Sequence, residues 1–121
     1  MITEAELDKF LRWPANPGRR VLSVYLQRES SSEKSFHRKF EVEFQTMSAV
    51  LEKELPKERR EEYRRDVEHA RNFLSSYEPQ GRTLVLFTDA SEGILWAKEL
   101  NVEIASQIQW LEKPFALPLL E

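Results

Sequence analysis

Apolar residues recur every three or four positions in two consecutive stretches of the chain. From Ser35 to Leu55 the apolar positions are Phe36, Phe40, Phe44, Met47, Leu51 and Leu55. After Pro56 they are Tyr63, Val67, Ala70, Leu74 and Tyr77. This spacing places the side chains of each stretch on one face of a helix, so the pattern predicts two long amphipathic helices. Pro56 suits the first turn of the second helix, where its missing N–H has no intrahelical partner.

Four other stretches have the character of strands. Residues 21–26, VLSVYL, carry apolar side chains on both faces, which is typical of an interior strand. Residues 83–87, TLVLF, form a continuous apolar run. After a tight turn at 89–93, GILWAKEL predicts a third strand, and the alternation in residues 102–110 predicts a half-exposed fourth. A long helical crossover between the first two strands favours parallel pairing with a right-handed connection.

The N-terminus predicts a short helix. Thr3 is placed as N-cap with Glu6 as its capping-box partner, and Ile2 against Leu7 as a hydrophobic staple. We expect the helix to run to about Trp13, because Pro14 follows. The predicted fold class is therefore α/β, with a mixed sheet of about four strands covered by two long helices and a short N-terminal helix.

Composition narrows the function. The 121 residues are 40% apolar and 32% charged, enough for one hydrophobic core, so we expect a single domain over residues 1–121. The net charge of -3 excludes a polybasic protein, and any nucleic-acid contact must come from a local basic stripe. Cysteine is absent, the start lacks signal-peptide features, and no apolar run approaches the roughly 18 residues of a membrane span. We expect a cytoplasmic protein with no membrane partner.

Catalytic residues are hard to find. The chain has two histidines, His37 and His69, and neither lies in a recognisable catalytic motif. His37 is expected to pack at the edge of the apolar stripe. His69 shares a helical flank with Glu62 and Asp66, a set that could hold a divalent ion, but such donors arise by chance on so charged a helix. With only three glycines a phosphate-cradling loop is also not expected. We predict no enzyme, no cofactor and no metal site.

A basic stripe on the second long helix is the best candidate for binding. Arg60, Arg64 and Arg71 fall within about 40° of one another around the helix axis. With the neighbouring basic residues, the candidate RNA-phosphate contacts are Lys57, Arg59, Arg60, Arg64 and Arg71. The simpler alternative is a solvated face with pairs four residues apart, namely Lys57–Glu61, Glu61–Arg65 and Arg64–Glu68. The short basic run at 18–20 specifies nothing by itself, and the three tryptophans are expected in the core or at its rim rather than as a base-stacking platform.

Several stretches together resemble a known family. They are VLSVYL, the two long helices meeting at a short turn, GRTLVLFTDASEGILWAKEL, and the closing IQWLEKPFALPLL. Over nearly the whole chain this arrangement resembles the N-terminal domain of archaeo-eukaryotic class I peptide release factors, and is most similar to their uncharacterised bacterial and archaeal relatives. In full-length members a central and a C-terminal domain follow, so the resemblance implies an excised domain whose partners include its own downstream domains.

The motifs that define release-factor activity are missing. The equivalent inter-helix turn, residues 54–59, contains no NIKS, the tyrosine-cysteine-phenylalanine element cannot occur without cysteine, and there is no GGQ. Stop-codon decoding and peptidyl-tRNA hydrolysis are therefore not expected. The resemblance implies instead a ribosome- or RNA-associated role such as rescue, hibernation or occupancy of a tRNA site, with the helical turn as the contact. The alternative is a protein-interaction or dimerisation module that uses a sheet edge or the tryptophan-bearing hairpin, with no RNA role.

Overall fold

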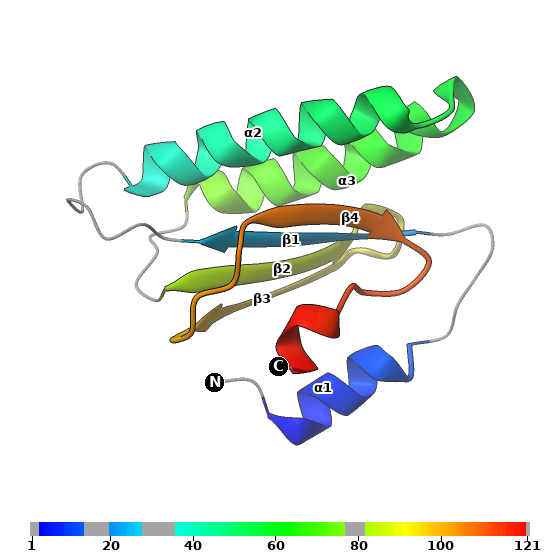
Figure 1. Cartoon of the computed structure of the whole chain (residues 1–121). Helices are drawn as coiled ribbons and strands as arrows, with labels where there is room; N and C mark the ends of the chain where they lie inside the picture. The colour runs from blue at the N-terminus through cyan, green and yellow to red at the C-terminus, as the bar shows by residue number, and fades with distance from the viewer. Residues whose placement is uncertain (1–2, 14–19, 28–35, 77–81, 121) are drawn as a thin grey trace.

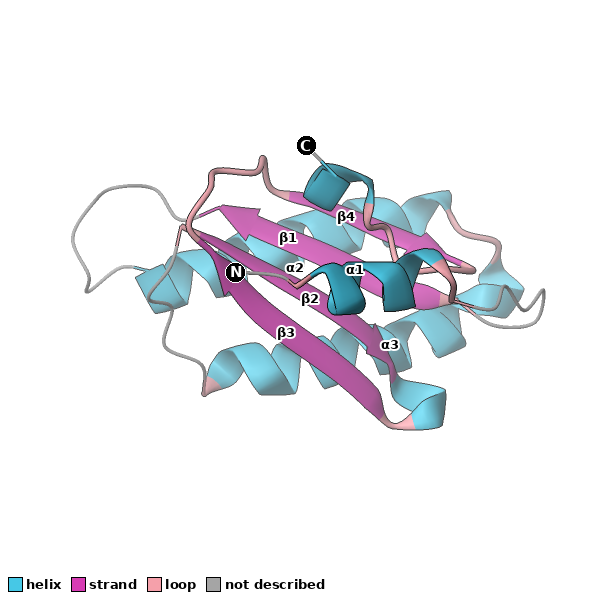
Figure 2. Cartoon of the chain, turned by 90° about the horizontal axis from the view of Figure 1, so that it is seen from below, coloured by secondary structure: helices cyan, strands magenta, loops and turns pink. Residues whose placement is uncertain are grey.

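A four-stranded sheet forms the middle of three layers. The computed structural model describes residues 3–13, 20–27, 36–76 and 82–120. The helices α2 and α3 cover one face of the sheet, while α1 and the C-terminal segment lie on the other (Figures 1 and 2). The elements in chain order are α1 (Glu4–Leu11), β1 (Val21–Gln27), α2 (Phe36–Glu54), α3 (Lys57–Ser75), β2 (Thr83–Asp89), β3 (Ile94–Leu100) and β4 (Gln107–Leu111). Short 3₁₀ turns occur at Ala90–Glu92 and Leu117–Leu120.

The predicted α/β class, the four strands, the two long helices and the short N-terminal helix are confirmed. The predicted parallel pairing, and with it the mixed sheet, is wrong: the strand order is β3-β2-β1-β4 and every pairing is antiparallel. The reason lies in the antiparallel pair of helices, α2 and α3, that connects β1 to β2. The helices α2 and α3 have 19 residues each, so α3 cancels the displacement of about 28 Å made by α2. The chain re-enters the sheet at the end it left, and β2 must run against β1.

Each face of the sheet carries its own core. On the helical side Leu22, Val24 and Leu26 of β1 pack with Phe44 of α2 and with Tyr63 of α3. On the opposite side the alternate residues of the same strands pack with α1 and the C-terminal segment, and this cluster comprises Phe10, Val21, Tyr25, Val85, Phe87, Leu100 and Ala116. The interior position predicted for the first strand is confirmed, because β1 lies between β2 and β4.

The residues expected at the starts of α1 and α3 lie at or next to the observed helix starts. The capping box of Thr3 and Glu6 is present as predicted. Pro56 is the N-cap of α3 rather than a first-turn residue, and Lys57 begins the helix. The predicted staple of Ile2 lies outside the described residues.

The fourth strand is shorter than predicted. The β4 strand begins at Gln107, and the preceding segment is irregular because Thr83 holds it. The Thr83 hydroxyl donates to the carbonyl of Val102 (2.8 Å) and accepts from the amide of Ile104 (3.0 Å). These two contacts tie the segment before β4 to the start of β2.

None of the helices in the described part of the chain combines the length and the apolar character needed to cross a membrane.

Candidate functional site

The bend between α2 and α3 faces solvent. It lies at the same end of the molecule as the start of β1 and the end of β4 (Figure 1). Glu54 ends α2, and the side chains of Pro56, Lys57 and Glu58 are exposed. The bend is therefore accessible to a partner, and the residues beside it form the candidate site.

Two of the predicted basic residues tie the two helices together. Arg60 donates from Nε to the carbonyl of Leu55 (3.2 Å) and from Nη2 to the carbonyl of Lys53 (3.5 Å), so it caps the C-terminal end of α2. Arg64 donates from Nε to Oε1 of Glu52 (2.8 Å), and this hydrogen bond holds the pKa of Glu52 below its usual value. The Arg64 side chain is 64% exposed, and exposed ion pairs add little stability, so a phosphate can compete for it.

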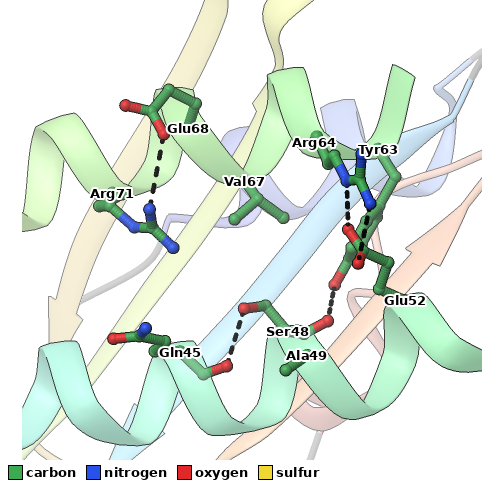
Figure 3. Close-up of a pocket in the computed structure, with 9 residues that line it drawn as sticks. All are labelled: Gln45, Ser48, Ala49, Glu52, Tyr63, Arg64, Val67, Glu68 and Arg71. Atoms are coloured by element: carbon green, nitrogen blue, oxygen red, sulfur yellow. Dashed lines mark hydrogen bonds and ion pairs between the residues drawn. The ribbon is translucent and has the colours of Figure 1, made fainter. Parts of the chain in front are cut away.

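A groove of about 350 Å³ runs between α2 and α3 on their outer side. Figure 3 shows Arg64 reaching across to Glu52 at one end and Arg71 beside Glu68 at the other. The Arg71–Glu68 ion pair measures 3.6 Å. The groove is lined by Gln45, Ser48, Ala49, Glu52, Tyr63, Arg64, Val67, Glu68 and Arg71. With two arginines and two glutamates the lining is formally neutral, so the groove alone is not a strong anion site.

The remaining predicted contacts, Lys57 and Arg59, lie in the first turn of α3. Lys57 is exposed and has no ion pair or hydrogen bond with any other described residue. Arg59 pairs with Glu62 (3.0 Å). The structure thus gathers four of the five predicted residues within the first eight positions of α3, whereas Arg71 lies about 10 Å beyond Arg64 along the helix.

The competing prediction of charge pairs is correct in part. Arg65 and Glu61 form their pair at 3.1 Å. The predicted Arg64–Glu68 pair is wrong, because α2 offers Arg64 a carboxylate across the groove. The predicted Lys57–Glu61 pair is not formed.

The three residues considered for a divalent ion are not brought together. Glu62 binds Arg59, and the Nδ1 atom of His69 lies 2.6 Å from Oγ1 of Thr88. The Thr88 hydroxyl donates to the carbonyl of Ile94, so His69 is the donor in its contact with Thr88. Among residues 3–13, 20–27, 36–76 and 82–120 no group of three or more acidic or histidine side chains could hold a metal ion. The side chain of His37 lies outside the described part.

A cluster around Trp110 is absent from the predicted site. Trp110 is buried in β4 and donates from Nε1 to Oδ2 of Asp66 (2.9 Å). The guanidinium carbons of Arg20 and Arg59 each lie 5.4 Å from the centroid of its ring. Tyr63 meets the ring edge-on at 5.4 Å. The cluster joins the start of β1, the first turns of α3 and the end of β4, at the same end of the molecule as the bend (Figure 1).

Asp66 of α3 holds this cluster in place through its hydrogen bond with Trp110. It is 3% exposed, and its Oδ1 atom accepts from the amide of Ala90 (2.7 Å). Burial raises the pKa of Asp66 to about 6, although the hydrogen bonds from Ala90 and Trp110 favour the charged form. One sequence signal could have indicated this role, because Asp66 interrupts the apolar stripe between Tyr63 and Val67. Arg20 belongs to the short basic run at 18–20, which by itself gave no indication of the contact with Trp110.

The other tryptophan predicted in a strand is a packing residue. Trp96 of β3 stacks on Phe87 with centroids 5.4 Å apart and packs edge-on against Phe10 of α1 at 4.6 Å. It is therefore not an exposed platform for bases.

Neither a comparison with models of known protein families nor a search of curated proteins finds a match for this chain.

Proposed function

We propose that the chain is a translation-related domain that associates with the ribosome or with RNA, resembling the N-terminal domain of peptide release factors but lacking NIKS and GGQ. The observation that carries the proposal is the solvent-exposed bend with Lys57, Arg59, Arg60 and Arg64 in the adjoining turns of α3. Such a cluster offers several phosphate contacts at one end of an otherwise acidic protein. The role is one of binding rather than catalysis.

The binding mode follows from how these side chains are held. Arg64 has its guanidinium at the surface, and Arg60 is positioned by backbone carbonyls instead of by a carboxylate. Arg60 has no hydrogen bond to a carboxylate, although its charge lies near enough to Glu52 to help lower the pKa of that carboxyl. A phosphodiester that approaches the bend would replace Glu52 as the partner of Arg64. Arg60 would then contribute a second positive charge to the same phosphate.

Cosedimentation with ribosomes and fluorescence anisotropy with ribosomal RNA fragments test the proposal. We expect binding at low salt. The logarithm of the binding constant should fall linearly with the logarithm of the salt concentration. The double variant Arg60→Glu, Arg64→Glu should weaken binding by about tenfold or more and reduce the salt slope. Arg65→Glu is the matched control, because Arg65 lies on the same helix with a similarly exposed side chain, 68% against 64%, but outside the stripe.

Circular dichroism of both variants separates lost binding from a weakened hairpin, since Arg60 also caps α2. If the wild-type protein fails to sediment with ribosomes at low salt, the proposal is wrong.

A protein-interaction role is the second candidate, and the outer face of α2 favours it. Val42 and Val50 are each 57% exposed, and the exposed residues between them on this face, Gln45, Thr46 and Ala49, carry no charge. In so charged a chain this is an unusual surface. Light scattering during the same binding study discriminates the two: a stable dimer that is insensitive to salt would favour this candidate.

A further inference from the structure

Two arginines from distant parts of the sequence share one tryptophan. Arg20 immediately precedes β1, and Arg59 lies in the first turn of α3. Because each guanidinium carbon is 5.4 Å from the centroid of Trp110, the two cations lie within about twice that distance of each other. The ring is fixed in turn by its hydrogen bond to Asp66 and its contact with Tyr63. The two guanidinium groups are therefore held in place before any ligand arrives.

The two arginines of this cluster differ in their partners, and the cluster also contains the carboxylate of Asp66, which accepts from Trp110. Arg59 has a carboxylate partner in Glu62. Arg20 has none among the described residues: its Nη1 donates to the carbonyl of Trp110 at 3.4 Å, and its Nε is buried with no hydrogen-bond partner. A buried donor without an acceptor is unfavourable, and more so on a cation. The exposed Lys57 adds a further positive charge in the same first turn as Arg59.

We infer that Arg20 and Arg59, held on Trp110, form a binding site for a phosphate group. An arginine presents its N–H groups as a planar fork that matches a tetrahedral oxyanion, and the Trp110 ring holds two such forks within about 11 Å of each other. Because Nε of Arg20 is buried, the side chain would have to shift for a phosphate oxygen to reach that donor. The proposed function does not include Arg20, so the site extends the contact surface from the bend to the sheet.

The phosphate has two possible sources, the backbone of RNA and free phosphate compounds. Titration of the whole protein followed by NMR of the arginine Nε–H and tryptophan Nε1–H groups distinguishes them. The probes are inorganic phosphate in one arm and a short duplex RNA in the other. We expect the signals of Arg20, Arg59 and Trp110 to move in at least one arm. A response to RNA alone indicates a backbone phosphate, and a response to inorganic phosphate indicates a free one.

Substitutions give the second readout. Arg20→Gln and Arg59→Gln should each weaken binding in the responding arm by about fivefold or more, because each removes a charged donor. Arg20→Lys, which keeps the charge and much of the stem but loses the fork, should fall between wild type and Arg20→Gln. Arg82→Gln is the matched control and should change affinity less than about twofold. Arg82 is exposed and lies by the end of β1, at the far end of the sheet from Arg20.

The outcomes separate this inference from the proposed function. If RNA binds while the Arg20 and Trp110 signals stay still and Arg20→Gln binds like wild type, the phosphate site is wrong and the proposed function stands. If inorganic phosphate moves these signals and RNA does not bind, the site stands and the proposed function fails. If neither probe moves the signals, the site is overturned whether or not the variants fold, because the wild-type titration decides it.

Discussion

At the scale of single residues, Asp66 is the side chain with the largest consequence for its surroundings. It joins three elements, since it lies on α3 and accepts hydrogen bonds from Trp110 of β4 and from Ala90 after β2. Burial raises its pKa to about 6, which means that the fold prefers the protonated acid. This preference makes the stability of the protein depend on pH in a defined direction.

Asp66→Asn tests this dependence. Well below pH 3.8, the ordinary pKa of aspartate, Asp66 is neutral in both folded and unfolded chains. As the pH rises to about 6 the unfolded chain loses this proton first, so the contribution of Asp66 to the free energy of unfolding falls and then levels off. Asparagine does not titrate. The stability of wild type minus that of the variant should therefore fall by roughly 1–3 kcal/mol between pH 4 and pH 7.

Urea unfolding at four pH values measures this difference. Glu6, whose pKa is lowered to about 2 chiefly by Lys98, acts in the opposite direction but is common to both proteins and cancels. A difference that does not vary with pH would contradict the prediction.

At the scale of elements, the helices, which were predicted from neighbouring residues, are confirmed, whereas the direction of the second strand, which rests on distant residues, is not. The capping box of α1 and the extents of α2 and α3 follow from residues three and four apart. The direction of β2 does not, because it depends on how far two helices carry the chain before it returns. The Trp110 cluster was also missed, since its members come from three elements and no local pattern connects them.

The turn between β2 and β3 gives an element-scale prediction. Gly93 has φ 66°, in the left-handed region, and an added Cβ would meet nothing within 4 Å. Gly93→Ala should therefore lower the free energy of unfolding by about 1 kcal/mol through backbone strain alone. Gly93→Asn is the control and should lower it less, because asparagine tolerates this conformation. Thermal and urea unfolding measure the expected order of stability, with wild type highest, Gly93→Asn next and Gly93→Ala lowest. Equal stability of all three proteins would contradict an effect of backbone strain.

At the scale of the whole molecule, the two cores share one sheet and should unfold together. Phe10 links α1 to the sheet, where it meets Phe87 at 4.8 Å as well as Trp96. Glu6 reinforces the contact by accepting from Lys98 (2.9 Å) and from Nε1 of Trp96 (3.1 Å). Strands β1 and β2 are buried on both faces, so loss of either layer exposes side chains that the other layer cannot cover.

Phe10→Ala tests this coupling. Removing a ring that is 2% exposed should lower the free energy of unfolding by about 3 kcal/mol. Near-ultraviolet and far-ultraviolet circular dichroism should still report one coincident transition. Val50→Ala, at an exposed position on α2, is the control and should change stability by less than about 0.5 kcal/mol. Two separated transitions would show that the layers unfold independently.

Because α2 and α3 have equal lengths, the distance of the bend from the sheet can change without any change in the pairing of the strands. Adding two full turns to each helix beside the bend would carry it about 10 Å further from the strands and still deliver the chain to the start of β2. If the turns were added to one helix alone, the chain would return about 10 Å away from the start of β2. Matched extension would thus change how far the bend reaches while leaving the sheet unchanged.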